Sequence, residues 1–298
     1  MNRFDAMSLF VAVADLGSFA AAANHTGVAR SVVTRQIAAL EAHLGVKLIV
    51  RTTRRLTLTS AGRAYLRKCR SILDLVDAAE AEVMEERLTP RGSVRIGLPL
   101  SFGLKRIAPL LPEFLRRHAE ITLAVDYTDR QIDLIDEGVD LTVRIAAQLQ
   151  PGDVARRLGS CRLLAVAAPA YLAAHGTPAH PAELAAHACL GYSTKAGNRP
   201  LAFVVDGRVE RFHFSWRMLA NNGDALAEAA ARGLGIAVLP DFIVADYHAR
   251  GELVTLLEAF EPPALGIHAL LPDNRYIPHR VRVLIDFLAE SIESAAPS

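Results

Sequence analysis

The chain has 298 residues, more than one typical domain, and its 51% apolar content can supply a full hydrophobic core, which excludes general disorder. The net charge of +1 is uneven: positions 1–59 hold seven basic and three acidic side chains, a net of +4, so the other 239 residues carry −3. This distribution predicts that only the N-terminal part meets a polyanion. Three cysteines without a CxxC pair argue against a disulfide framework or a zinc site, and the sequence has no signal-peptide pattern or membrane-length apolar run, so we expect a cytoplasmic protein.

The first residues predict a helix-turn-helix. Residues 5–15 place apolar side chains on one face of a helix that Gly17 ends. Ser18 is then a good N-cap for a second helix of small residues, although its position also permits a phosphate contact. Gly27 breaks this helix, and a third one is predicted over residues 29–44. Short helices joined by a glycine-containing turn are typical of this motif.

The helix predicted over 29–44 has one apolar face, formed by Val32, Val33, Ile37, Leu40 and Leu44. Its other face carries short or fork-shaped hydrogen-bonding side chains near the N-terminal end: Arg30, Ser31, Thr34, Arg35 and Gln36. A helix that reads base edges in a major groove needs this arrangement, while the alternative is an ordinary solvated face. Arg35 could read a base, contact a backbone phosphate, or pair with Glu41.

A two-stranded wing is predicted after Gly45. Leu48, Val50, Leu56 and Leu58 alternate about a basic tip in a β-branched stretch. We expect Arg51, Thr53 and Arg54 to contact phosphate or the minor groove. A solvated turn is the alternative.

A long helix is predicted from Ser60 to Leu88, with no glycine or proline after Gly62. A heptad-like stripe, interrupted by Glu80, runs along it: Leu66, Cys69, Leu73, Val76 and Val83. This stripe predicts pairing with the same helix of a second copy; the alternative is a helix packed on its own domain. Residues 89–92 then mark a domain boundary.

The remaining pattern predicts two α/β lobes. Strands over 93–98, 121–127 and 139–145 alternate with helices over 102–118 and 131–138, which indicates a parallel sheet. A second set follows, with strands over 161–168, 188–193, 202–207, 209–216 and 235–240 and helices over 169–176, 223–233 and 241–249. A strand over 266–272 and a helix over 281–294 are then expected to belong to the same lobe as the first set of elements. Two lobes crossed more than once by the chain suit a hinged clamp.

On these residues the chain resembles the LysR-type transcriptional regulators. The resemblance is strongest in FVAVADLGSFAAAA and in SVVTRQIAALEAHLGVKLIVRTTRRLTLTSAG, and it continues through RIGLPLSFG, VDLTVRI and GDALAEAAARGLGIAVLP. It implies an α/β protein with a winged helix-turn-helix DNA-binding domain (1–59), a linker, or dimerisation, helix (60–90) and a periplasmic-binding-protein-like effector domain (91–298). Lobe I of that domain is expected at about 91–161 and 266–298, and lobe II at about 162–265.

One departure concerns the start of the recognition helix. The family usually has a serine N-cap there, whereas this chain has Ala29 followed by Arg30. Losing a cap costs about 1 kcal/mol, so Ser31 could cap a helix that starts later. Arg30 also adds a charge that could meet a phosphate or a guanine edge.

The resemblance implies a sequence-specific transcriptional regulator that is not an enzyme and has no metal or cofactor. Its expected partners are a double-stranded DNA operator and further copies of itself, as a homodimer and then a tetramer or larger assembly. RNA polymerase joins them if the protein is an activator. A small organic effector, bound between the lobes, is expected to control DNA binding by favouring one lobe arrangement. No membrane contact is expected.

The expected effector contacts are Ser101, Phe102, Thr128, Arg144 and Asn222. Backbone N–H groups at the helix start near Ser101 favour an anion, and ligands gather at the carboxyl ends of strands, where Thr128 and Arg144 fall. A carboxylate is therefore the predicted effector class. Arg144 could instead pair with Asp140 or Asp153, and Asn222 could cap the helix that follows it.

Rival functions have weaker signals. LPLSFG is not a G-x-S-x-G nucleophile elbow, and the sequence has no P-loop or dinucleotide fingerprint. A small-molecule-binding protein or hydrolase with a vestigial DNA head is one alternative. A thiol-based redox regulator that uses Cys161 is another, although a lone buried cysteine is usually a small hydrophobe.

Overall fold

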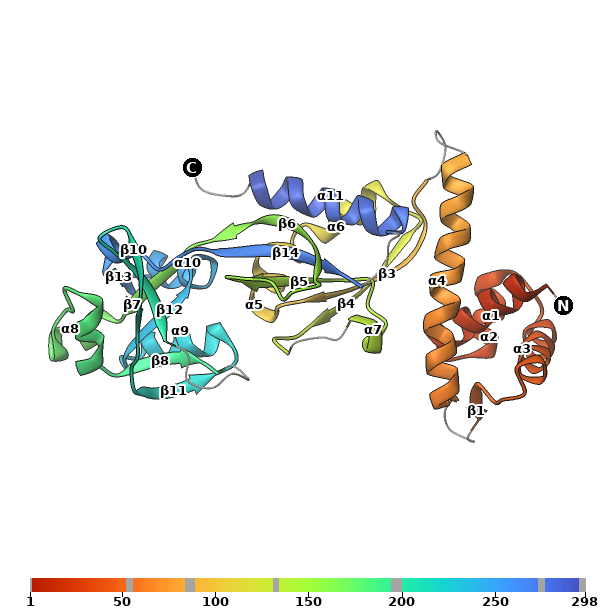
Figure 1. Cartoon of the computed structure of the whole chain (residues 1–298), viewed down its shortest axis with the longest axis horizontal. Coiled ribbons are helices and arrows are strands. Elements are labelled where there is room, and N and C mark those ends of the chain that lie inside the picture. The colour runs from red at the N-terminus through yellow and green to blue at the C-terminus, as the bar shows by residue number, and fades with distance from the viewer. Residues whose placement is uncertain are drawn as a thin grey trace. The chain divides into compact units, whose positions relative to one another are not determined.

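A computed structural model describes residues 2–51, 56–83, 89–130, 134–193, 200–272 and 277–294 of the chain (Figure 1). The chain forms two compact units. The first consists chiefly of Met1–Thr89, and the second chiefly of Pro90–Asn274 with Arg280–Ser298.

The first unit is a helical head with a small hairpin and a long helix. Its elements are α1 (Arg3–Leu16), α2 (Phe19–Thr26), α3 (Arg30–Leu44), β1 (Ile49–Arg51), β2 (Leu56–Leu58) and α4 (Ser60–Val83). α2 begins at the predicted N-cap, since Ser18 Oγ accepts a hydrogen bond from Ala21 N at 3.3 Å. It ends at Gly27, whose φ of +68° a glycine adopts without strain. The predicted helix-turn-helix and wing strands are confirmed.

The core of the head explains the helix faces. Of the predicted α3 stripe, Val33, Ile37 and Leu40 are buried, and they pack in one cluster with side chains of α1 and α2. Cys69 of α4 is fully buried in the same cluster, and Leu66 packs against it. The prediction that Cys69 pairs with a second copy is therefore wrong, because its side chain lies in the core of its own head, while pairing through the half-buried Leu66 stays a prediction.

Lobe I of the second unit contains a mixed five-stranded sheet. Its strand order is β4 (Ile121–Tyr127), β3 (Gly92–Leu98), β5 (Leu141–Ala146), β14 (Leu265–Leu271) and β6 (Val154–Cys161). β3 pairs in parallel with β4 and β5, whereas β14 runs antiparallel to β5 and β6. The helical elements are α5 (Leu100–Phe102), the π-helical turn η1 (Gly103–Ile107), α6 (Leu111–Arg117), α7 (Leu134–Glu137) and α11 (His279–Ser294). α6 and α11 lie on the same side of the sheet, where Phe114 and Phe287 are in contact (Figure 1).

Lobe II has a second mixed sheet of similar design. Its strand order is β11 (Trp216–Ala220), β8 (Cys189–Tyr192), β12 (Ile236–Pro240), β7 (Leu163–Ala167) and β13 (Val254–Leu256). A separate hairpin joins β9 (Leu201–Val205) to β10 (Arg208–Phe212). The helices are α8 (Pro169–His175), α9 (Gly223–Ala231) and α10 (Asp241–Ala249), with 3-10 turns η2 (Pro181–Ala186) and η3 (Glu258–Phe260).

The chain passes between the two lobes twice. Arg162 is the one residue between β6 of lobe I and β7 of lobe II, and residues 257–264 connect β13 back to β14. The Arg162 guanidinium pairs with the Glu261 carboxylate, so a salt bridge joins the two crossing segments. The predicted double crossing is therefore present.

Several predicted elements differ from the structure. The parallel pattern predicted for residues 93–145 is confirmed, since β3 pairs in parallel with β4 and β5, but each sheet also contains antiparallel pairs that were not predicted. The helix predicted over 102–118 is broken into η1 and α6 around Pro109, which has no N–H to donate to a continuing helix. The strand predicted over 209–216 is two strands in different sheets, since β10 ends at Phe212 and β11 begins at Trp216.

Candidate DNA-binding and effector-binding sites

The predicted groove-facing side chains lie along the first turns of α3. Arg30, Ser31 and Arg35 are exposed, and Thr34 and Gln36 are half-buried. Ala29 is the N-cap residue of α3 and supplies no side-chain hydrogen bond. The suggestion that Ser31 caps a later start is wrong, because Ser31 lies within the helix. The exposed N-terminal face is thus available to hydrogen-bond a ligand.

Glu41 joins α3 to the wing. The sequence indicates it only as a partner of Arg35 and does not predict this structural role. Its carboxylate is buried and accepts hydrogen bonds from Leu48 N at 2.9 Å and Ile49 N at 3.1 Å. Lys47 Nζ lies 2.6 Å from the other oxygen. Burial alone would raise the pKa of Glu41, but Lys47 and the two N–H donors outweigh it and hold the pKa below its ordinary value. Glu41 is therefore taken by the wing, which removes it as the alternative partner of Arg35.

The wing strands pair in a short antiparallel ladder. Ile49 lies opposite Leu58, and Arg51 lies opposite Leu56. The first turn of α4 packs directly on this hairpin, since a Cβ on Gly62 would lie 2.1 Å from Leu48 O. Thr53 and Arg54 lie outside the described residues, as does the side chain of Arg51, so their predicted contacts stay predictions.

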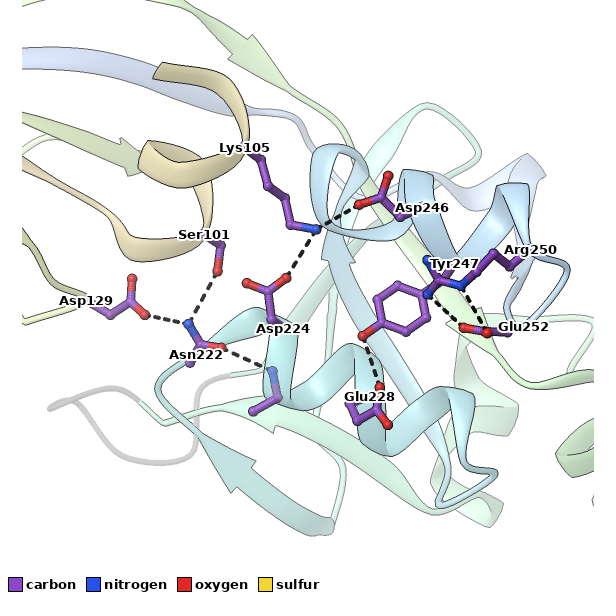
Figure 2. Close-up of polar contacts among 11 residues, drawn as sticks. Ser101, Lys105, Asp129, Asn222, Asp224, Glu228, Asp246, Tyr247, Arg250 and Glu252 are labelled. Atoms are coloured by element: carbon purple, nitrogen blue, oxygen red, sulfur yellow. Dashed lines mark hydrogen bonds and ion pairs between the residues drawn. The ribbon is translucent and has the colours of Figure 1, made fainter. Parts of the chain in front are cut away.

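In the second unit, Asn222 connects the two lobes (Figure 2). It is the N-cap of α9 in lobe II, where its Oδ1 accepts a hydrogen bond from Ala225 N at 3.1 Å. Its Nδ2 donates to two residues of lobe I, Asp129 at 2.9 Å and the buried Ser101 Oγ at 3.3 Å. The predicted capping role and a role between the lobes thus belong to the same side chain.

Asp129 occupies the position expected for an anionic ligand. Its Oδ1 accepts a hydrogen bond from Leu100 N at 3.0 Å, at the start of α5. Thr128, one residue earlier, uses its hydroxyl to accept from Arg130 N at 3.2 Å. The expectation that the N–H groups at this helix start are free is therefore wrong for Leu100, whose partner is a carboxylate of the chain itself.

Lys105 makes a second connection between the lobes. From η1 it lies 3.4 Å from Asp224 of α9 and 3.1 Å from Asp246 of α10 (Figure 2). Nearby in the chain, the buried Phe102 packs edge-on against Phe242 of α10, with ring centres 5.1 Å apart. We call the six polar residues the interlobe cluster: Ser101, Lys105, Asp129, Asn222, Asp224 and Asp246.

Arg144 pairs with an acidic residue of its own lobe. Its guanidinium lies 3.4 Å from Asp153. The other sequence candidate, Asp140, instead accepts a hydrogen bond from Arg95 N at 2.7 Å. Within the described part of the chain, no hydrogen bond or ion pair joins Arg144 to the interlobe cluster.

Family models match both units. The model of the LysR substrate binding domain matches residues 88–293, and that of the bacterial regulatory helix-turn-helix protein, lysR family, matches residues 4–63. The chain is a LysR-type transcriptional regulator. Members of this family are DNA-binding regulators of transcription that form oligomers and are generally not enzymes.

Relatives match this regulator along nearly its whole length. The regulator CrgA of Neisseria meningitidis serogroup C is 36% identical over 287 residues, 96% of each chain, and PtxR of Pseudomonas aeruginosa is 36% identical over 285 residues, 95% of this chain and 91% of that one. The solved structure of CrgA is 34% identical, covers 97% of this chain and 98% of its own, and has a TM-score of 0.61. The Vibrio cholerae virulence activator AphB is 26% identical, covers 96% of this chain and 98% of its own, and has a TM-score of 0.58.

The cysteines of this regulator argue against a thiol switch. Cys69, Cys161 and Cys189 are all buried and free. Burial raises the pKa of Cys161 to about 12, with a further contribution from Asp241, and raises the pKa of Cys69 and of Cys189 to about 11. Reactive cysteines are thiolates in accessible, electropositive surroundings, and none of these three has such a site.

Two negative findings apply to the described residues. Among them, no group of three or more histidine, cysteine or acidic side chains could hold a metal ion. No helix within the same residues is both long enough and apolar enough to cross a membrane.

Proposed function

We propose that this regulator reads its operator with the first turns of α3. The observation that supports this is the exposed row of Arg30, Ser31 and Arg35 on a helix whose other face is fixed in the head core. Arginine forks suit guanine edges and phosphates in the major groove. The wing adds phosphate contacts through Arg51, Thr53 and Arg54.

Substitution of Arg35 tests this proposal. Arg35→Ala is expected to weaken binding to an operator selected from random duplexes by about 1–3 kcal/mol, because a base contact is lost. His43→Ala is the control, since His43 is exposed near the other end of the same helix. Fluorescence anisotropy with operator and scrambled duplexes measures both. Unchanged discrimination between the duplexes in Arg35→Ala would refute base reading by this residue.

We further propose that the effector is a small organic carboxylate that binds at the interlobe cluster. Two donors, Leu100 N–H and the Asn222 amide, already converge on the carboxylate of Asp129. An effector carboxylate would replace Asp129 there, with Ser101 beside it and the rings of Phe102 and Phe242 as apolar neighbours. In this scheme Thr128 contributes by positioning Asp129, and Arg144 stays with Asp153.

Calorimetry with the full chain tests this effector class. A panel of aromatic and short-chain carboxylates is titrated alongside the matching amides. We expect carboxylates alone to bind, and Ser101→Ala to weaken them about tenfold through one lost hydrogen bond to a charged group. Equal binding of acids and amides, or an unaffected Ser101→Ala variant, would remove the carboxylate proposal and leave the family assignment untouched.

The oligomer is proposed to form through α4. Leu75 of α4 is 56% exposed, so this helix presents an apolar side chain that a partner helix could bury. Near the N-terminal end of the same helix, Ala64 and Tyr65 border an apolar groove with Leu44 and Val46 of the head. Pairing of two such helices would bury this surface and present two heads to two half-sites. Assembly into tetramers and contact with RNA polymerase stay predictions.

A further inference from the structure

Three basic side chains lie in a row across lobe I. The strand register pairs His268 of β14 with Arg144 of β5 on one side and with Arg157 of β6 on the other, next to a bulge that leaves Leu158 as the extra residue of β6. Directly opposed residues of antiparallel strands project from the same face of a sheet. With neighbouring strands about 4.8 Å apart, the two arginine backbones flank the histidine at a separation of about 10 Å.

This row is on the sheet face that α11 does not cover. Arg156, the neighbour of Arg157, pairs with Asp286 of α11, so alternation along β6 directs Arg157 to the other face. Ile267 and Ala269, on either side of His268, are buried, whereas His268 is only partly buried and Arg157 is exposed. The row is therefore accessible to a ligand.

The imidazole of His268 is held in a defined place. Its Nε2 lies 2.3 Å from the position that a Cβ on Gly266 would take, so the ring lies over a residue that must lack a side chain. Burial, and secondarily the charge of Arg157, hold the pKa of His268 below its ordinary value. The lowered pKa favours the neutral ring at pH 7, and the ring gains a second N–H donor when it takes up a proton.

The positive charges of Arg144 and Arg157 are only partly neutralised by acidic side chains. Asp153 is 3.4 Å from Arg144 and also accepts a hydrogen bond from Gln150 N at 2.9 Å. Arg157 donates to Gly159 O at 3.4 Å, a long hydrogen bond to a neutral acceptor. In the described part of the chain, no acidic side chain forms an ion pair with Arg157. One positive charge thus remains beside a neutral imidazole.

We propose that Arg144, His268 and Arg157 form a binding site for one small oxyanion, a carboxylate or a tetrahedral anion such as a phosphate. Arg157 binds it as the main charge, Arg144 shares its guanidinium between the anion and Asp153, and His268 donates from the centre. The anion offsets the effect of Arg157 on His268, so binding draws a proton onto the imidazole. The site contains no residue of the interlobe cluster and does not depend on the proposed effector position.

Calorimetry of the full chain at pH 7 tests this site. Sulfate and acetate are the tetrahedral and planar probes, at an ionic strength fixed with sodium chloride, in two buffers with different ionisation enthalpies. We expect binding by at least one probe, with proton uptake seen as a difference between buffers. Arg157→Gln should lower affinity at least about tenfold, while Arg156→Gln, on the opposite sheet face, should leave it unchanged.

The histidine is tested separately. His268→Gln should retain weaker binding and lose the buffer dependence, because the proton acceptor is absent. Preference for acetate over sulfate assigns the site to carboxylates, and the reverse assigns it to phosphate-like groups. Absence of binding by the wild type at millimolar concentrations, or equal affinity in Arg157→Gln, would overturn the proposal. Persistent proton uptake in His268→Gln would remove His268 from it.

Discussion

At the scale of single residues, Glu41 shows how one buried carboxylate fixes two DNA-binding elements together. It lies on α3, yet its partners are the backbone N–H groups of Leu48 and Ile49 at the start of the wing. Lys47 contributes less than the short distance suggests, because its side chain is 74% exposed and exposed ion pairs are worth about 0–1 kcal/mol. The two buried N–H groups matter more, since each would be left unsatisfied without Glu41.

Glu41→Gln is expected to destabilise the head by about 1–3 kcal/mol at pH 7, because one charged acceptor for two buried donors is lost. The folded pKa is lowered, so this stabilisation is present above the ordinary carboxyl pKa of 4.5 and is lost as the pH falls through the folded value. Thermal unfolding of both proteins at pH 7 and at acid pH measures the difference. Asp5→Asn, at an exposed acid of α1, is the control. A difference that persists undiminished at acid pH would contradict this account.

At the scale of elements, α4 shows what a sequence pattern can and cannot settle. A long helix that begins at Ser60 and carries an apolar stripe was predictable, whereas its predicted end at Leu88 lies outside the described residues. Which part of the stripe covers the head depends on contacts with α1 and the wing, far away in sequence: Arg70 pairs with Asp15, and Cys69 enters the head core. Leu75 lies off the predicted stripe and remains exposed.

Leu75→Glu is therefore expected to weaken dimerisation at least tenfold, since it places a charge in the proposed helix pair. Operator affinity should fall with it, because a single head meets only one half-site. Leu75→Met, which keeps the side chain apolar, is the matched control. Sedimentation velocity gives the oligomer and anisotropy gives the DNA affinity. An intact oligomer in Leu75→Glu would assign pairing to another surface.

Elsewhere, long periodic elements were predictable and context-dependent ones were not. The helices α3, α9 and α11 follow apolar periodicity, and their positions agree with the predictions. The strand β6 was not predicted, because its sequence VARRLGSC has two successive arginines in place of the apolar alternation expected of a strand. One of these arginines pairs with α11, and the other lies on the opposite, open face of the sheet. Ser101 and Asn222, two of the predicted effector contacts, lie in the interlobe cluster, whereas Lys105 and Asp129 of that cluster were not singled out from the sequence. In the sequence, a lysine or an aspartate looks like an ordinary solvated surface residue. Its part in a contact between lobes becomes visible only when the folded chain places the other lobe next to it.

At the scale of the whole effector domain, the interlobe cluster sets how firmly the lobes are held together. Lys105 bridges two carboxylates, but its side chain is 28% exposed, and those of Asp224 and Asp246 are 38% and 65% exposed. Each such pair is worth about 0–1 kcal/mol. The Asn222 amide donates to the exposed carboxylate of Asp129 and to the buried hydroxyl of Ser101; a hydrogen bond to a charged group is worth up to about 1.5–3 kcal/mol and less where water reaches it, and the bond to the buried hydroxyl adds to it. Asn222 therefore contributes more than Lys105, and an effector shifts the lobes only if its affinity differs between their arrangements.

Asn222→Asp tests this ranking with a change of almost no volume. The aspartate still caps α9 by accepting from Ala225 N, since Asp is as good an N-cap as Asn. Its second oxygen, however, faces Asp129 in place of a donor, and two like charges at hydrogen-bond distance repel. We expect hydrogen exchange in the full chain to accelerate at α5, η1 and the start of α9, while α4 and β14 keep their protection. Lys105→Met is expected to give a smaller acceleration in the same segments, and Arg232→Gln, which breaks only the exposed pair with Glu228 on α9, should give none across the lobes. A Lys105→Met effect larger than that of Asn222→Asp would reverse the ranking and make the ion pairs the main hold between the lobes.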